Sequence, residues 1–381
     1  MLLALAPAVG VEAQRNAQLI GYTELQTNLA GGRHANVRTM RASVMQADGT
    51  SPRHIAEELI DKPNTWTQFA GWSPDGSHAM VLHSWQDPAN AAWEEEHKTF
   101  RMEPGKWLVD SCLVELGSGR VQNVTAVGRV SHYNTGLFFV PNGHALGFTA
   151  LIDGISKPYL MDRDGRNKRD ISAGGTGFTY GYSASPDGRL ISYHESYQLY
   201  EANVDGTAKR HIETGQPFNF APAWSPDGEW LLFVSGEHYN CHPYVVRRDG
   251  TGLRKLADRG SYRGVVEFLD VPDFHGGSSD LPVWSVDGKL VFFTAADKST
   301  GNIELYQSTL DGAVTQLTST PAGTLHYHPA PSPDGAQLLY GSKRNGIRQL
   351  FVMNLVDHAE HQLTHLTTGH AAMWPHWQPL K

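Results

Sequence analysis

The chain has 381 residues, and 31 Lys and Arg against 39 Asp and Glu give it a formal net charge of −8. This balance argues against a nucleic-acid-binding protein, which would carry a basic stripe. Charged residues make up only 18%, whereas the 39 glycines and 21 prolines are typical of an all-β protein with many turns. The two cysteines, Cys112 and Cys241, indicate no disulfide framework, and whether they pair is left open.

Residues 1–14 are predicted to be the remnant of a signal peptide. A short apolar run precedes Val11-Glu12-Ala13, which is a small-x-small cleavage pattern. The pattern predicts a periplasmic or secreted protein, with the cytoplasm as the alternative because the basic n-region is missing. No later run reaches the roughly 18 apolar residues of a membrane helix. Residues 15–381 are therefore expected to form one domain.

A repeat built on Ser-Pro-Asp-Gly runs through that domain. Copies begin at Ser73, Ser185, Ser225, Ser285 and Ser332, a degenerate copy is Val140-Pro141-Asn142-Gly143, and a final half-copy ends at Pro379. Most copies follow one another after about 40 to 47 residues, with longer gaps after the first and the fourth. Periods of this length, built from short strands, indicate the blades of a propeller.

Each repeat is predicted to form one four-stranded antiparallel blade. An apolar strand ends at the Asp-Gly turn, a β-rich strand such as 230–234 follows, and a second Asp-Gly turn joins the third and fourth strands. Strands at 19–25 and 38–45 precede the first copy, and 373–379 supplies a single inner strand at the end. We therefore expect an all-β, seven-bladed β-propeller in which the N-terminal strands close the last blade and remove exposed edges.

The loops opposite the Asp-Gly turns should surround the central channel, and they collect histidines, aromatics and amides. Aromatic, amide and hydroxyl groups suit a carbohydrate ligand, and arginines can hold its carboxylate. For each residue the alternative is an ordinary surface arginine or a packed aromatic ring. The predicted substrate-binding residues are Arg33, His34, Trp66, Gln68, His132, Tyr180, Arg263 and Arg344.

A metal site is predicted from two histidines that lie two residues apart. His326 and His328 on one extended strand should point to the same side and can chelate one ion. His242 and His275 come from loops on the same face. Nitrogen ligands of this number suit a divalent ion, here Mn²⁺, Zn²⁺ or Ca²⁺, and geometry would choose among them. The alternative is a pair of strand histidines with ordinary hydrogen bonds.

Three elements in order carry a resemblance to a known group: Tyr193-His194-Glu195, Asn240-Cys241-His242, and His326-x-His328. With the blade repeat, they resemble the seven-bladed propeller polysaccharide lyases, nearest to the oligogalacturonate lyase family. The resemblance implies that His194 is the catalytic base and that the last three histidines bind a divalent metal. That family has a ligand Gln three residues before His-x-His, where this chain has Gly323, so His275 or water would be the fourth ligand. Tyr239 is the competing acid or base.

The function implied is β-elimination on a glycan that contains uronic acid. A metal or an arginine neutralises the C6 carboxylate, a base removes the C5 proton, and the C4-linked oxygen leaves. Lyases of ulvan-type or rhamnose–glucuronate polymers are alternatives. So is a non-catalytic, periplasmic TolB-like binding propeller, because its blades carry the same repeat. A peptidase propeller of the prolyl oligopeptidase type would need an α/β-hydrolase domain, for which no residues remain.

Overall fold

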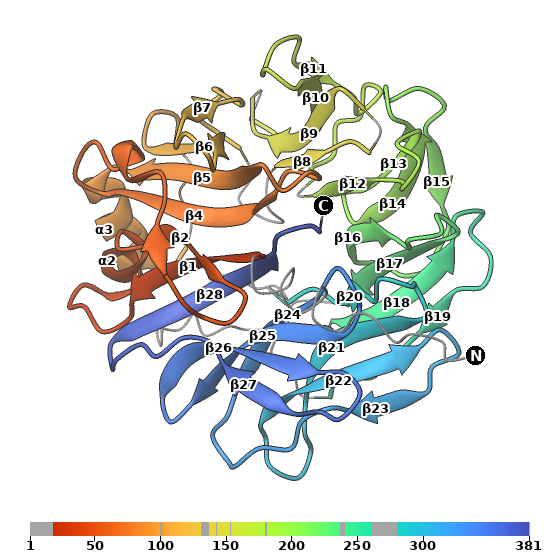
Figure 1. The fold of residues 1–381 in the computed structure, drawn as a ribbon. Coiled ribbons are helices and arrows are strands. Elements are labelled where there is room, and N and C mark those ends of the chain that lie inside the picture. The colour runs from red at the N-terminus through yellow and green to blue at the C-terminus, as the bar shows by residue number, and fades with distance from the viewer. Residues whose placement is uncertain are drawn as a thin grey trace, which may run out of the picture.

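The protein is a β-propeller whose antiparallel sheets surround a common centre (Figure 1). The computed structural model describes residues 18–99, 101, 103–130, 137–141, 143–152, 154–179, 181–236, 241–260 and 280–380. The predicted signal remnant at 1–14 lies outside these residues. Cys112 and Cys241 are both buried and do not form a disulfide with each other.

Five separate sheets have four strands each, in chain order. The first two contain β4 (Thr65–Trp72), β5 (His78–Gln86), β6 (Trp107–Glu115) and β7 (Val121–Asn123), then β8 (Leu137–Phe139), β9 (Ala145–Ala150), β10 (Lys157–Asp162) and β11 (Arg169–Asp170). The third and fourth contain β12 (Tyr182–Ala184), β13 (Leu190–Glu195), β14 (Gln198–Asn203) and β15 (Arg210–Ile212), then β16 (Asn219–Trp224), β17 (Trp230–Ser235), β18 (His242–Arg247) and β19 (Arg254–Lys255). The fifth contains β20 (Val283–Trp284), β21 (Leu290–Ala296), β22 (Ile303–Thr309) and β23 (Val314–Gln316).

The prediction of seven separate blades is wrong, because in the described residues five four-stranded blades stand alone and the remaining eight strands form one sheet. These are β24 (His326–Pro331), β25 (Gln337–Arg344), β26 (Ile347–Asn354), β27 (Glu360–Gln362), β28 (His370–Trp377), β1 (Leu19–Gln26), β2 (Arg41–Gln46) and β3 (Arg53–His54). A single parallel residue pair, Arg348 with Ala371, joins β26 to β28. Each half of this sheet still repeats the four-strand order of the other blades.

The N-terminal strand closes the ring by pairing with the C-terminal one. β1 runs antiparallel to β28 from Ile20 opposite Trp377 to Gln26 opposite His370. Figure 1 shows the red first strand beside the blue last one. The predicted closure is therefore present, and it leaves neither strand as a free edge.

The repeated turn folds in the same way in every full copy. In the copy at Ser225, the serine Oγ donates to Asp227 at 2.5 Å, and the Trp230 amide donates to that Oγ at 2.9 Å. The Asp227 carboxylate also accepts from the Glu229 amide at 3.0 Å. Side-chain bonds of this kind fix a tight turn, which explains why the motif recurs at each start of a second strand.

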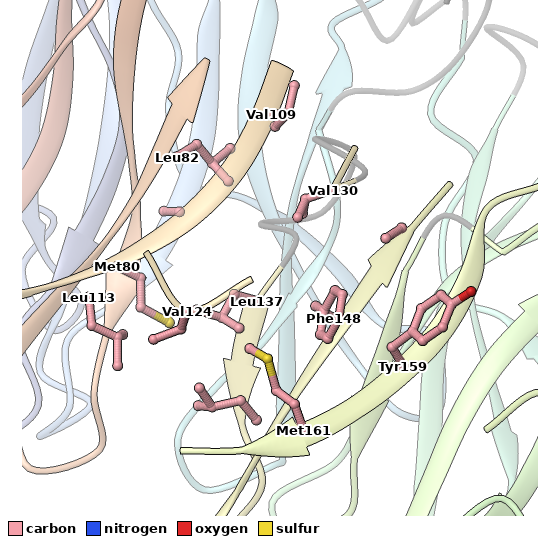
Figure 2. Packing of buried hydrophobic residues seen from close by; sticks show 13 residues of the cluster. Met80, Leu82, Val109, Leu113, Val124, Val130, Leu137, Phe148, Tyr159 and Met161 are labelled. Carbon is pink, nitrogen blue, oxygen red and sulfur yellow. The ribbon is translucent and has the colours of Figure 1, made fainter. Parts of the chain in front are cut away.

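Apolar side chains fill the space between neighbouring blades. Figure 2 shows Met80, Leu82 and Val109 of one blade packed toward Phe148 and Met161 of the next. Repeated tryptophans add bonds between blades. The indoles of Trp72, Trp284 and Trp377 each donate to a carbonyl of the preceding inner strand at 3.1 Å.

Two α-helices, α2 (Gly32–Val37) and α3 (Pro88–His97), lie in loops between second and third strands, and a 3₁₀ helix spans Glu57–Leu59. The segment 86–107 belongs to the longer gap after the first repeat copy, and its helix α3 was not predicted. Across the described ranges, no helix is long and apolar enough to cross a membrane.

Candidate functional site

The candidate site lies where inner strands begin and second strands turn into third strands. Five of the predicted residues fall outside the described part of the chain and stay predictions: His132, Tyr180, Tyr239, Arg263 and His275. The other predicted residues can be placed, and they fall into several separate groups.

His326 forms a fully enclosed pair with Glu304. Its Nε2 lies 3.2 Å from Glu304 Oε2, and the two side chains are 0% and 1% exposed. Glu304 also accepts from the hydroxyls of Thr318 and Thr320, both at 2.6 Å. Burial alone would raise the pKa of Glu304, but these bonds and His326 lower it to about 2. Burial lowers the pKa of His326, so the ring is neutral and oriented by a carboxylate.

His328 pairs with a different carboxylate, that of Asp280. Asp280 Oδ1 accepts from the His328 amide at 2.8 Å and lies 3.0 Å from its Nδ1. Burial opposes ionisation of Asp280, but its bonds to His328 and Thr294 and the nearby Arg259 charge hold its pKa below the usual range. The histidine has a left-handed backbone, φ 52°, at a bulge of β24. A non-glycine residue in this region costs of order 1–3 kcal/mol, and Ala221 and Trp374 have the same conformation at the equivalent point of their inner strands, so the bulge belongs to the blade repeat.

The outer nitrogen of His328 is buried and has no hydrogen-bond partner among the described residues. The ring is 12% exposed and stacks on Trp374 of the inner strand β28, with ring centroids 5.8 Å apart. A carboxylate on one nitrogen fixes the tautomer and leaves the other nitrogen as an acceptor. His328 Nε2 is therefore a suitable ligand atom for an ion, a water or a substrate proton.

His242 lies at the start of β18, and its Nδ1 accepts from the Arg259 amide at 3.2 Å. A neutral ring with this bond carries its proton on Nε2, which is the nitrogen a metal would need. Burial, followed by Lys255, lowers the pKa of His242. Arg259, 1% exposed, donates to Thr294, whose hydroxyl donates to Asp280 at 2.6 Å, so His242 and His328 are ends of one buried network.

The predicted metal ligands are thus held by separate partners. In the parts of the chain that the structure describes, no group of three or more His, Cys, Asp or Glu side chains is arranged to hold a metal ion. The orphaned Nε2 of His328 fits a ligand, whereas His242 in its present hydrogen bond does not. The metal therefore stays a prediction.

His194, the predicted base, is 1% exposed in β13. Its ring lies among Phe178, Tyr197 and Phe220, with ring centroids 5.9 to 6.4 Å away. Burial lowers its pKa to about 4. The ring is neutral, as a base must be, but the aromatic side chains separate it from solvent, so its placement does not favour contact with a substrate.

The turn after His194 has an unusual conformation. Ser196 and Tyr197 join β13 to β14 in a two-residue loop with φ of 47° and 67°. Such turns prefer Asn-Gly, because both central residues need a positive φ. Here the Ser196 amide donates to Phe178, and the backbone and side-chain amides of Asn219 donate to the Tyr197 carbonyl at 3.0 and 2.9 Å. These bonds on both sides hold the strained turn in place.

Arg33 and His34 lie in α2, and both are buried. His34 Nε2 is 3.5 Å from Glu94 of α3, so the helix contacts the insertion at 86–107. Burial, helped by Arg33, lowers the pKa of His34 to about 4. Glu94 is 0% exposed and accepts from Gln86, Asn90, Trp107 and the Arg101 amide. This network explains His34 structurally, and the substrate role of both residues stays a prediction.

Trp66, Gln68 and Arg344 are also placed. Trp66 is 5% exposed and lies edge-on to Trp107, so it packs in the core rather than stacking on a sugar as predicted. Gln68 is half-buried in β4. Arg344 binds both oxygens of Glu360, at 2.8 and 2.7 Å, and these bonds raise its pKa against the effect of burial. Its guanidinium is therefore already occupied by a carboxylate of the protein.

A surface cavity of about 450 Å³ lies beside the blade of β20 to β23. Asp258, Asp297, Lys298 and Tyr306 line it, and none of the predicted site residues does. Sequence reasoning also missed Asp280, Glu304 and Glu94. Glu304 could have been noticed as a lone acid inside the apolar strand 303–307, where a buried carboxylate needs partners.

Comparison with known proteins supports the fold. No known protein family matches the chain. The uncharacterized protein Atu1656 of Agrobacterium fabrum is 23% identical over 248 residues, which are 62% of this chain and 70% of that protein. The structure of TolB from Acinetobacter baumannii is similar with a TM-score of 0.55 and 15% identity, over 96% of this chain and 67% of TolB.

An oligogalacturonate lyase in complex with manganese is similar with a TM-score of 0.56 and 15% identity, over 91% of this chain and 85% of the lyase. The chain is therefore a β-propeller of the kind that TolB and oligogalacturonate lyase have. At these identities the likeness concerns the fold alone.

Proposed function

We propose that this propeller is a lyase that cleaves uronic-acid-containing glycans by β-elimination. The observation that carries the proposal is His328, which is fixed by Asp280 and left with a nitrogen that has no partner among the described residues, beside the inner strand β28. An orphaned buried polar atom favours a functional position. The similarity to a manganese-bound oligogalacturonate lyase is consistent with this reaction class.

In this proposal Nε2 of His328 would hold a divalent cation, and such an ion would supply the positive charge that neutralises the C6 carboxylate of the substrate. Asp280 keeps the ring in the required tautomer, and the Arg259–Thr294 network holds Asp280 in place. Because His194 is enclosed, the base that removes the C5 proton is assigned to Tyr239, the predicted competitor. The polymer is a galacturonate, ulvan-type or rhamnose–glucuronate chain.

A second candidate function is a non-catalytic TolB-like binding propeller. It is favoured by the internal bonds of His242 and His326, which explain two of the histidines without a ligand. The TM-scores to TolB and to the lyase, 0.55 and 0.56, do not separate the two.

The test is incubation of the protein with a panel of uronate polysaccharides and oligosaccharides, with and without Mn²⁺. A lyase produces 4,5-unsaturated uronates, which are detected by ultraviolet absorbance. His328→Ala should abolish this signal. If the wild-type protein binds a glycan of the panel without releasing unsaturated product, the binding-propeller function replaces the lyase.

A further inference from the structure

Four aromatic rings gather where two neighbouring blades meet on the proposed substrate face. They are Phe178 before β12, Tyr197 in the β13–β14 turn, Phe218 before β16 and Phe220 in β16. All four are half-buried, so each presents part of its surface to solvent. Phe178 leads into the inner strand β12, Phe218 and Phe220 lie at the start of the inner strand β16, and Tyr197 lies in the turn that joins the second and third strands of the β12–β15 blade.

Tyr197 is the centre of this group. Its ring is edge-on to Phe178, Phe218 and Phe220, with centroids 4.8, 5.2 and 5.1 Å away. Such edge-to-face contacts fix the orientation of a ring. The strained turn and the hydrogen bonds to its backbone fix the Cα as well. The side chain is therefore held before any ligand arrives.

The hydroxyl of Tyr197 has no hydrogen-bond partner among the described residues, in contrast to the phenols of Tyr182, Tyr327 and Tyr340, which bond to the protein. The hydroxyl oxygen of Tyr197 is also not buried, so it can reach a ligand. Gln198 lies next to the patch, and the nearby Glu195 carboxylate is paired with Lys209. A rigid aromatic surface with a free hydroxyl and an amide beside it matches the face of a pyranose ring.

We propose that Tyr197, positioned by the three phenylalanines, forms a subsite on which a sugar ring of the substrate stacks, with the phenol hydroxyl bonded to a hydroxyl of the sugar. This inference rests on the proposed glycan function and names a binding residue for it. The His194 ring lies parallel to that of Tyr197, with ring centroids 6.4 Å apart. The subsite recognises ring faces and hydroxyls, so it contributes to affinity whether or not the sugar carries a carboxylate.

The test compares three variants with the wild-type protein, using oligogalacturonate as the probe and calorimetry as the binding measurement. Tyr197→Phe removes only the hydroxyl and should weaken binding about fivefold. Tyr197→Asn removes the ring, keeps a residue that accepts a positive φ, and should weaken binding about tenfold or more. The matched control is Tyr200→Phe, since Tyr200 stacks on Tyr193 away from this patch, and it should bind like the wild type.

Release of unsaturated product is measured on the same samples, and circular dichroism confirms that each variant is folded. If the wild type binds and cleaves the probe while both Tyr197 variants bind equally well, the subsite is overturned and the lyase stands. If the wild type binds without cleaving and the Tyr197 variants bind more weakly, the lyase is overturned and the subsite stands. A wild-type protein that binds neither oligogalacturonate nor any other glycan of the uronate panel overturns both.

Discussion

Two histidines of one strand, His326 and His328, have different surroundings. Each contacts a carboxylate from the preceding blade, Glu304 or Asp280. The Glu304 pair is enclosed and belongs to a network of threonines that fixes the following loop. The Asp280 pair includes a partly exposed ring whose Nε2 has no partner among the residues that the structure describes, whereas the His326 ring, whose Nδ1 also has none, is fully enclosed. We infer that the first pair stabilises the fold and that the second serves the ligand.

The largest expected effect is the loss of Glu304. Glu304→Ala leaves the hydroxyls of Thr318 and Thr320, the Thr320 amide and His326 without their acceptor. Breaking a buried network of this kind should lower the free energy of unfolding by about 3–5 kcal/mol. Denaturant unfolding measures the effect, and Glu213→Gln, at an exposed site, is the control. A loss below about 1 kcal/mol would contradict a structural role for this pair.

The next effect concerns pH and extends the comparison to His194, another enclosed histidine. Its folded pKa of about 4 lies below the ordinary 6.5, so the unfolded chain takes up a proton between these values and the folded chain does not. The contribution to stability is present above pH 6.5 and is lost as the pH falls toward 4, by about 3 kcal/mol in all.

His194→Leu should therefore reduce the slope of unfolding free energy against pH in this range, by up to about 1.4 kcal/mol per pH unit. Unfolding curves recorded at several pH values between 7 and 4 measure this slope. An exposed histidine, His365, gives the control substitution His365→Leu. An unchanged slope in His194→Leu would show that the ring is not enclosed in solution.

These pairs also show what the sequence could and could not predict. The Ser-Pro-Asp-Gly turns are local, so the tight turns and the strands that follow them were predicted correctly, although the serine–aspartate bonds that hold them were not. The closure by β1 and β28 was also predicted, because the chain ends on a single inner strand and begins with strands that precede the first repeat copy. The count of separate blades did not, because one residue pair, Arg348 with Ala371, joins two sets of strands. That pairing depends on how closely the blades approach, which a repeat cannot encode.

The site was predicted less well, because its partners come from other blades. Strand geometry suggested that His326 and His328 share one ion. Their carboxylate partners, Glu304 and Asp280, lie 22 and 48 positions away in the chain, and no sequence motif indicates them. Trp66 shows the same problem, since only the fold brings it to Trp107. Residue type therefore indicated the chemistry, whereas long-range packing determined which side chains remain available.

A smaller effect on stability, with a large effect on activity, is expected for His328. His328→Asn keeps a residue that tolerates a positive φ but removes the ring from Asp280 and Trp374. Stability should change by about 1 kcal/mol or less, because the site is strained and partly exposed. Glycan cleavage should fall about 10²-fold or more if this ring is the ligand of the reaction centre. His361→Asn is the exposed control, and unchanged cleavage would contradict the functional role.

The smallest effect is expected at Arg344, which was predicted to hold a substrate carboxylate. It contacts Glu360, and Nη2 also donates to the Tyr340 phenol at 3.1 Å, while Tyr340 lies edge-on to His326. Arg344 therefore belongs to the enclosed pair rather than to the ligand-binding one. Its side chain is 23% exposed, so solvent screens the ion pair with Glu360.

Arg344→Lys keeps the charge but loses the two-pronged geometry. The unfolding free energy should fall by less than about 1 kcal/mol, with no change in the KM for glycan cleavage. Unfolding and kinetic measurements on one preparation of the variant separate the two outcomes. A rise in KM at unchanged kcat would mean that Arg344 leaves Glu360 to bind the substrate. Arg344, and with it the surroundings of His326, would then belong to the ligand-binding site.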